Sequence, residues 1–187
     1  DLYIEKIQSG GFVMGKKVAV LVPNPVNGYG LFAYLEAFFE NGVEYKTFAV
    51  NSTKNVKTNS GLALELDGVI GDLKGHEAEY DGVVFACGDA IKEFAKHKEE
   101  AEYKDMFEVI AKFNELNKKL AGHCAAGLVF EIAGVIKDKK VALHPYAKAA
   151  VNSGIATDNS SMISQNVFTA KTEESAMEMI PYFIWAL

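Results

Sequence analysis

Cys124 lies at the centre of the segment Gly122-His123-Cys124-Ala125-Ala126-Gly127, whose residue types are suited to nucleophilic chemistry. The apolar residues before it predict a strand, and the run from 125 to 132 predicts a helix that stops at Gly134. A nucleophile on a sharp strand-to-helix turn crowds the positions two before and two after it. Gly122 and Ala126 leave that space open, so we expect Cys124 to adopt a strained or left-handed backbone conformation.

The same position favours the reactive form of the thiol. The positive end of a helix dipole stabilises a thiolate, which is the nucleophilic form of cysteine. The alternative is a buried, inert cysteine that only packs at a strand–helix junction, because free cysteines are commonly structural. The small residues around Cys124 favour the functional interpretation.

Two further segments place reactive groups at the ends of predicted strands. The buried run Val83–Ala86 ends at Cys87-Gly88, and the strand Lys140–Leu143 ends at His144. Ligands of doubly wound sheets bind at the carboxyl ends of the strands, so these groups are expected near Cys124. His144 is then a candidate proton carrier within reach of the sulfur. An ordinary loop histidine explains the spacing equally well.

The elements that must position these residues alternate along the chain. Apolar runs predict buried strands, and amphipathic runs that end at Gly or Asn predict helices. The predicted order indicates an α/β fold that is doubly wound around a mostly parallel sheet. Besides those already given, the predicted strands are Lys17–Val22, Val43–Val50, Leu62–Leu66, Leu120–His123 and Val167–Ala170, and the predicted helices are Gly30–Asn41, Tyr103–Asn117 and one capped by Thr172 that contains Pro181.

Composition narrows the class of protein. The 187 residues suit one domain, which we place at 14–187, with 1–13 as an extension outside it. The net charge is −6 and every basic residue is lysine, which argues against a nucleic-acid partner. No apolar run approaches the roughly 20 residues of a membrane span. Only two cysteines are present, which fits a reducing, cytoplasmic environment. The sequence has no close-spaced pair of metal ligands, so we expect neither a metal nor a cofactor.

The elbow segment at 122–127, the His144-Pro145-Tyr146-Ala147-Lys148 stretch and the run Val83–Gly88 together resemble the ThiJ/PfpI superfamily, a class I glutamine-amidotransferase-like group. The likeness extends from Lys16 to Leu187. It implies a flavodoxin-like sandwich and a homodimer or larger homo-oligomer. It also implies that Cys124 is the nucleophile, that His144 lies beside it, and that the amides of Gly88 and Ala125 bind an oxyanion.

The chain departs from the family pattern at the acid. The family places a glutamate in the first helix where this chain has Gly30, and the loop Asn24–Gly30 contains no carboxylate. The departure argues against glyoxalase- or deglycase-type proton transfer. His123 precedes the cysteine, so strand alternation directs its side chain away from the thiol and towards packing or an oligomer contact.

Two functions remain open on this sequence. The first is a cysteine-dependent hydrolase of the PfpI protease or amidase type, in which Cys124 attacks a carbonyl and His144 handles protons. The second is a non-catalytic or redox role for a reactive thiol, with Cys87 as a redox partner if the two sulfurs meet. A buried Cys87 directed into the core is the simpler interpretation of that residue.

Overall fold

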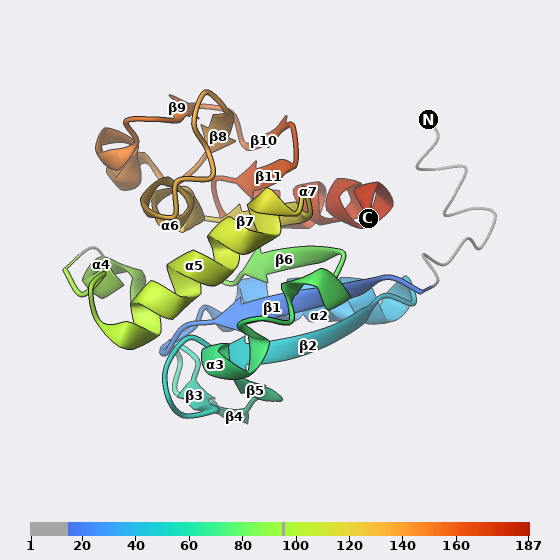
Figure 1. The fold of residues 1–187 in the computed structure, drawn as a ribbon. Coiled ribbons are helices and arrows are strands. Elements are labelled where there is room, and N and C mark those ends of the chain that lie inside the picture. The colour runs from blue at the N-terminus through green and yellow to red at the C-terminus, as the bar shows by residue number, and fades with distance from the viewer. Residues whose placement is uncertain (1–14, 95) are drawn as a thin grey trace.

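The computed structural model describes residues 15–94 and 96–187, and the proposed extension at 1–13 lies outside them. A seven-stranded sheet in the order β10-β11-β7-β6-β1-β2-β5 crosses the molecule (Figure 1). Only β10 pairs with its neighbour in the antiparallel sense. This confirms the doubly wound, flavodoxin-like α/β fold. The strands of the sheet are β1 (Lys17–Val22), β2 (Glu44–Ala49), β5 (Gly68–Val69), β6 (Gly82–Phe85), β7 (Lys119–His123), β10 (Ser161–Ser164) and β11 (Val167–Ala170).

Helices cover both faces of this sheet (Figure 1). On one face α2 packs against α7, and on the other face lie α3, α5 and α6. The helices are α2 (Gly28–Glu40), α3 (Ile70–Leu73), α4 (Ile91–Phe94), α5 (Ala101–Glu115), α6 (Ala126–Ile132) and α7 (Glu173–Ala186), with 3-10 turns η1 (Glu77–Glu79) and η2 (Pro145–Ala150).

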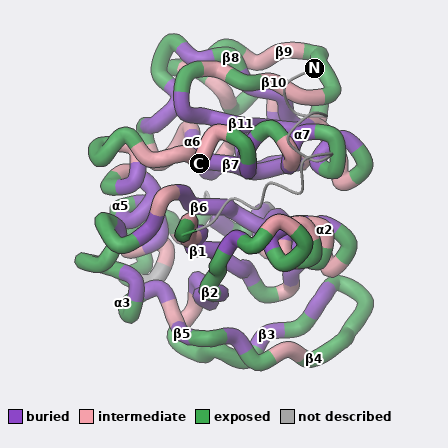
Figure 2. The backbone as a smooth tube through the Cα atoms, turned by 90° about the vertical axis from the view of Figure 1, so that its right-hand side faces the viewer, coloured by how far each residue is buried: buried purple, intermediate pink, exposed green. Residues whose placement is uncertain are grey.

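The strand β1 shows why the sequence folds this way. Val18, Val20 and Val22 face the α2–α7 layer, and the intervening Ala19 and Leu21 face the α3–α5–α6 layer. A strand covered on both faces must be apolar at every position, which is why a continuous apolar run predicts it. The central strands are buried along most of their length (Figure 2).

Element limits differ from the sequence prediction by one or two residues. The first helix begins at Gly28 rather than Gly30, because the Asn27 side chain caps it by accepting a hydrogen bond from the Gly30 N–H at 2.6 Å. The helix predicted at Tyr103–Asn117 runs from Ala101 to Glu115. Thr172 caps α7 as predicted, and its hydroxyl accepts from the Ser175 N–H.

One strand belongs elsewhere. The prediction placed Lys140–Leu143 among the alternating strands of the main sheet. Instead β8 (Lys140–Ala142) pairs in parallel with β9 (Ile155–Thr157) in a separate two-stranded sheet. A second small sheet pairs β3 (Asn55–Lys57) with β4 (Ala63–Glu65) in the antiparallel sense, and β4 corresponds to the predicted strand Leu62–Leu66. His144 therefore reaches the site from a layer beside the main sheet.

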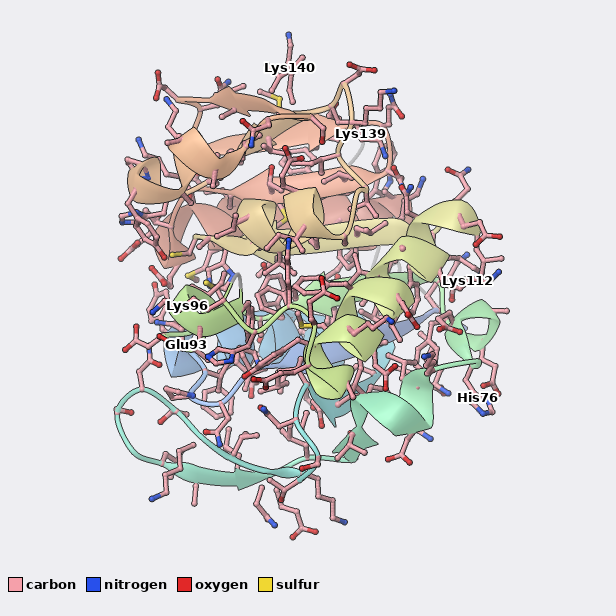
Figure 3. The ribbon with its side chains drawn as sticks, turned by 60° about the vertical axis from the view of Figure 1, so that its left-hand side comes forward. His76, Glu93, Lys96, Lys112, Lys139 and Lys140 are labelled. Atoms are coloured by element: carbon pink, nitrogen blue, oxygen red, sulfur yellow. The ribbon has the colours of Figure 1, made fainter. Side chains whose placement is uncertain are left out.

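A buried lysine ties the β8 layer to the body of the protein. Lys139 is almost fully buried, whereas Lys96, Lys112 and Lys140 project outward (Figure 3). The Lys139 Nζ donates to the Val135 carbonyl and to the side chains of Asn114 and Asn166. Burial lowers the pKa of this amine. Within the described ranges, no helix is long and apolar enough to cross a membrane.

Candidate active site

Cys124 occupies the turn between β7 and α6. Its φ is 56°, in the left-handed region that a non-glycine residue enters only when its surroundings hold it there. Gly122 makes the turn possible, because a Cβ on it would lie 2.4 Å from the Ala126 Cβ. The backbone conformation and the need for small neighbours are those that the sequence predicts. The side chain is half-buried and lies on the α3–α5–α6 side of the sheet.

The second cysteine meets the first. Cys87 follows β6 and is 3% exposed, and its thiol hydrogen-bonds the Cys124 sulfur. This hydrogen bond is the main cause that lowers the pKa of Cys124 and raises the pKa of Cys87. The Ala125 N–H also lowers the pKa of Cys124, while burial and the charges of Glu173 and Asp89 oppose the shift. The Cys87–Cys124 contact therefore favours a thiolate on Cys124.

Two backbone amides point at the sulfurs. The Ala125 N–H hydrogen-bonds both cysteines, and the Gly88 N–H hydrogen-bonds Cys87. Gly88 packs directly against the loop after β1, where the Asn27 N–H donates to the Cys87 carbonyl at 2.8 Å. The two residues expected to supply an oxyanion site thus lie beside the thiol pair.

His144 reaches the same cavity from η2. Its backbone N–H donates to the Cys124 carbonyl at 2.8 Å, and its ring packs on Tyr146 with the centroids 4.6 Å apart. Its Nδ1 accepts from the Tyr146 N–H at 3.4 Å. That the His144 ring lies within reach of the Cys124 sulfur stays a prediction.

A cavity of about 220 Å³ brings these groups together. The sequence prediction missed its other polar walls: Glu173 comes from α7, Asp89 follows β6, and Asn27 and Asn59 come from two loops. Nothing in the sequence around Glu173 marks it as part of a site, because an acidic residue in the first turn of a helix is expected anyway. The lining residues are Asn27, Asn59, Cys87, Gly88, Asp89, Ile91, Cys124, His144, Tyr146 and Glu173.

The His123 side chain points away from the Cys124 thiol, as strand alternation predicts. It is buried on the α2–α7 side, where the Tyr34 hydroxyl lies 3.2 Å from its Nδ1. Its ring therefore lies on the opposite face of β7 from the Cys124 sulfur. Across the two described ranges, no group of three or more histidine, cysteine or acidic side chains has the arrangement of a metal site.

Comparison with known proteins matches this fold to named relatives. Protein ppBat of Bacteroides thetaiotaomicron is 54% identical over 174 residues, which cover 93% of this chain and 99% of that protein. The crystal structure of the "putative protease I" of the same organism has a TM-score of 0.90 at 54% identity and covers 92% and 99% of the two chains.

A more distant structure shares the fold alone. Oxidised Toxoplasma gondii DJ-1 has a TM-score of 0.78 at 19% identity and covers 92% of this chain and 90% of its own. Residues 16–184 match the family described as DJ-1/PfpI. With a family match over most of its length and a relative 54% identical over nearly all of it, the chain belongs to the DJ-1/PfpI family.

Proposed function

We propose that this protein is a cysteine-dependent hydrolase of small amides, short peptides or reactive carbonyl compounds. The observation that carries the proposal is the state of Cys124. Its sulfur sits on a left-handed turn and receives hydrogen bonds from the Cys87 thiol and the Ala125 N–H. A thiolate stabilised in this way is the form that attacks a carbonyl carbon.

The surrounding groups supply the remaining steps. Attack by Cys124 places a negative charge on the carbonyl oxygen, and the amides of Gly88 and Ala125 stabilise it. His144 takes the Cys124 proton to become an imidazolium and then gives that proton to the leaving amine, so the carbon–nitrogen bond breaks and a thioester forms. Water then cleaves the thioester and Cys124 leaves as thiolate. The cavity of about 220 Å³ is smaller than the roughly 300–1,000 Å³ typical of drug-sized ligands, which supports small substrates.

Thiol reactivity tests this proposal. We expect iodoacetamide to alkylate Cys124 with a pH midpoint below the ~8.5 of an ordinary thiol. Replacing Cys87 with Ala removes the donor, so the midpoint should move to higher pH, while Cys87→Ser keeps a donor and should move it less. An activated ester such as p-nitrophenyl acetate should leave an acyl group on Cys124, located by peptide mass spectrometry. An ordinary thiol midpoint and no acyl adduct would remove the basis for a hydrolase.

A second candidate function is a redox one, favoured by the contact of two thiols in one cavity. The Cys124 thiolate would attack one oxygen of a peroxide and break its O–O bond. Cys124 becomes a sulfenic acid, and the other oxygen leaves as an alcohol or water. The Cys87 sulfur would then attack the Cys124 sulfur, a disulfide would form, and the hydroxyl would leave as water. In this role Cys87 protects Cys124 from irreversible oxidation. The cytoplasmic location expected from the cysteine content is consistent with both functions and stays a prediction.

We propose that the protein acts as a homodimer. Helix α2 carries both buried and exposed aromatic residues. Tyr34 and Phe38 are buried, but Phe39 is 77% exposed. Tyr29 is also exposed, and its hydroxyl lies 3.2 Å from the Sδ of Met177 on α7. A second copy of the chain would cover this apolar surface of α2 and α7.

Light scattering at micromolar concentration should therefore report the mass of two chains. Met177→Lys puts a charge into the surface and should reduce that mass to one chain. Leu62→Lys, at an exposed apolar residue before β4, is the matched control and should leave the dimer unchanged. A wild-type mass of one chain would contradict the proposal.

A further inference from the structure

Gly30 lies directly under the His123 ring. A Cβ built on Gly30 would fall 2.4 Å from the His123 Nε2, a distance that real Cβ atoms do not adopt. No side chain can therefore stand at position 30 while His123 keeps its place. The ring fills the space at the start of α2 that a longer residue would otherwise use.

One nitrogen of this buried ring has no hydrogen-bond partner among the described residues. Tyr34 lies at Nδ1, but Nε2 is fully enclosed and unpaired. Burial lowers the pKa of His123 to about 4, so the ring is neutral near pH 7. Burial also raises the pKa of Tyr34, so its hydroxyl keeps its proton and can donate to Nδ1. The His123 proton then sits on Nε2.

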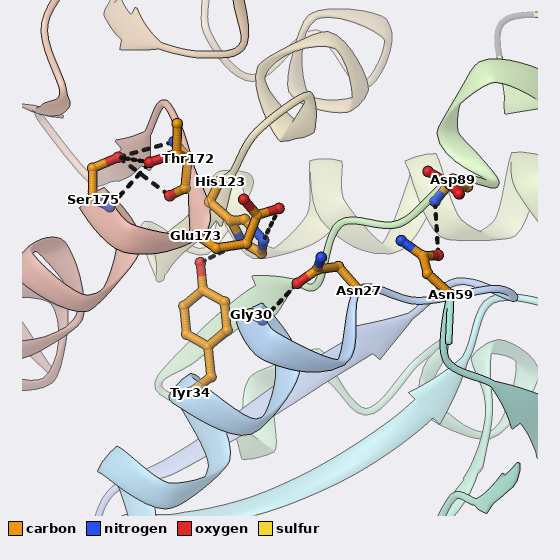
Figure 4. Close-up of polar contacts among 9 residues, drawn as sticks. All are labelled: Asn27, Gly30, Tyr34, Asn59, Asp89, His123, Thr172, Glu173 and Ser175. Carbon is orange, nitrogen blue, oxygen red and sulfur yellow. Dashed lines mark hydrogen bonds and ion pairs between the residues drawn. The ribbon is translucent and has the colours of Figure 1, made fainter. Parts of the chain in front are cut away.

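That nitrogen points at a carboxylate of the Cys124 cavity. The carboxylate of Glu173 lies beside the His123 ring (Figure 4). Its Oε1 is 4.0 Å from the His123 Nε2, and the Glu173 side chain is 27% exposed. A small rotation of the carboxylate would turn this contact into a hydrogen bond, which would satisfy the buried N–H. Glu173 is fixed at the first position of α7, because Thr172 and Ser175 hydrogen-bond each other across the cap (Figure 4).

We propose that Glu173 is the general base of the Cys124 cavity and that His123 holds its carboxylate in position. This inference rests on the proposed hydrolase function. In the second half of the reaction the Glu173 carboxylate takes a proton from the attacking water, whose oxygen bonds to the thioester carbon. The carbon–sulfur bond then breaks and Cys124 leaves as thiolate. Glu173 is the catalytic residue, and His123 is a positioning residue.

The charged and titratable groups that face Cys124 come from three parts of the chain. Cys87 and Asp89 follow β6, His144 and Tyr146 belong to the segment after β8, and Glu173 begins α7. The Glu173 charge raises the pKa of Cys124, so neutralising it should lower that pKa. Glu174, the next residue, is exposed and does not line the cavity.

The comparison of Glu173→Gln with Glu174→Gln tests the proposal, because both remove one charge from the same helical turn. With p-nitrophenyl acetate, we expect Glu173→Gln to acylate normally but to hydrolyse the thioester about 10²–10⁴-fold more slowly, the usual contribution of a general base. In the same variant, the pH midpoint for alkylation of Cys124 by iodoacetamide should move to lower pH. Glu174→Gln should match the wild type in both measurements.

The outcomes distinguish failure of the hydrolase function from failure of Glu173 as its general base. If the wild type forms no acyl adduct, the hydrolase function fails. If the wild type turns over and Glu173→Gln behaves like Glu174→Gln, Glu173 is not the base and the inference alone is overturned. His123→Ala should slow thioester hydrolysis in the wild-type background and cause no further loss in Glu173→Gln. An equal loss in both backgrounds would mean that His123 acts only through packing.

Discussion

Mild peroxide treatment of the reduced protein should join Cys87 to Cys124 in a disulfide. The thiols already share a hydrogen bond, and this bond lowers the pKa of Cys124, so Cys124 reacts with peroxide first. The resulting sulfenic acid then has a thiol beside it. Peptide mapping under non-reducing conditions should show the cross-linked pair as the main product, and dithiothreitol should restore both thiols.

Variants of Cys87 decide whether it resolves the sulfenic acid. In Cys87→Ala and Cys87→Ser no second thiol is present, so Cys124 should proceed to the sulfinic acid, which dithiothreitol does not reduce. The product would change from almost entirely reversible to almost entirely irreversible. A wild-type protein that accumulates sulfinic acid on Cys124 with Cys87 free would refute the redox pair. It would mean that the backbones are held outside the Cα separation of roughly 4.4–6.8 Å that a disulfide needs.

The simpler interpretation of Cys87 from the sequence was correct in part. Cys87 is buried in the apolar cluster between the sheet and α5, as a small core residue would be. Its thiol nevertheless reaches Cys124, because the carboxyl ends of β6 and β7 are neighbours in the sheet. The sequence predicts the neighbouring strand ends, but side-chain direction at each end depends on packing that it does not display.

Local patterns were sufficient for the main elements. The run Lys17–Val22 forms β1 with the predicted limits, since its apolar residues are followed directly by Pro23. The left-handed turn at Cys124 was also predictable, because Gly122 and Ala126 are the small residues that it requires. Alternation along β7 likewise placed His123 on the face opposite the thiol.

Long-range contacts account for what was missed. The strand β8 contains only three residues, and its partner β9 lies beyond η2, so no local signal separates it from the strands of the main sheet. Glu173 enters the cavity only because α7 starts beside His123 and Cys124. Its place in the first turn of a helix has a complete local explanation in the helix dipole, which hides any further role.

Replacing Gly88 with Ala should damage both stability and reactivity. A Cβ at Gly88 would lie 2.1 Å from the Pro25 carbonyl oxygen and 2.7 Å from the Val26 Cα. These are backbone atoms, so no flexible side chain can move aside. Overpacking of this kind costs about 1–3 kcal/mol, and we expect the upper end here. For a domain of this size each kcal/mol lowers the melting temperature by roughly 2–4 °C.

Reactivity should fall for a separate reason. To relieve the clash, the loop after β1 must move away from Cys87-Gly88, which breaks the hydrogen bond from the Asn27 N–H to the Cys87 carbonyl. The Gly88 N–H then no longer points at the oxyanion. Removing one oxyanion donor typically lowers the rate of the chemical step by about 10²–10³-fold. Thermal melts and the rate of Cys124 acylation by p-nitrophenyl acetate measure the two effects.

Gly71→Ala is the matched control for Gly88→Ala. Gly71 lies within α3, where an added Cβ meets no atom within 4 Å, so the same substitution should be neutral or stabilising by about 0.5–1 kcal/mol. A Gly88→Ala protein that melts with the wild type and acylates at the wild-type rate would show that the Gly88 amide takes no part in the reaction. A protein that melts early yet acylates normally would separate the packing of Gly88 from the chemistry of Cys124.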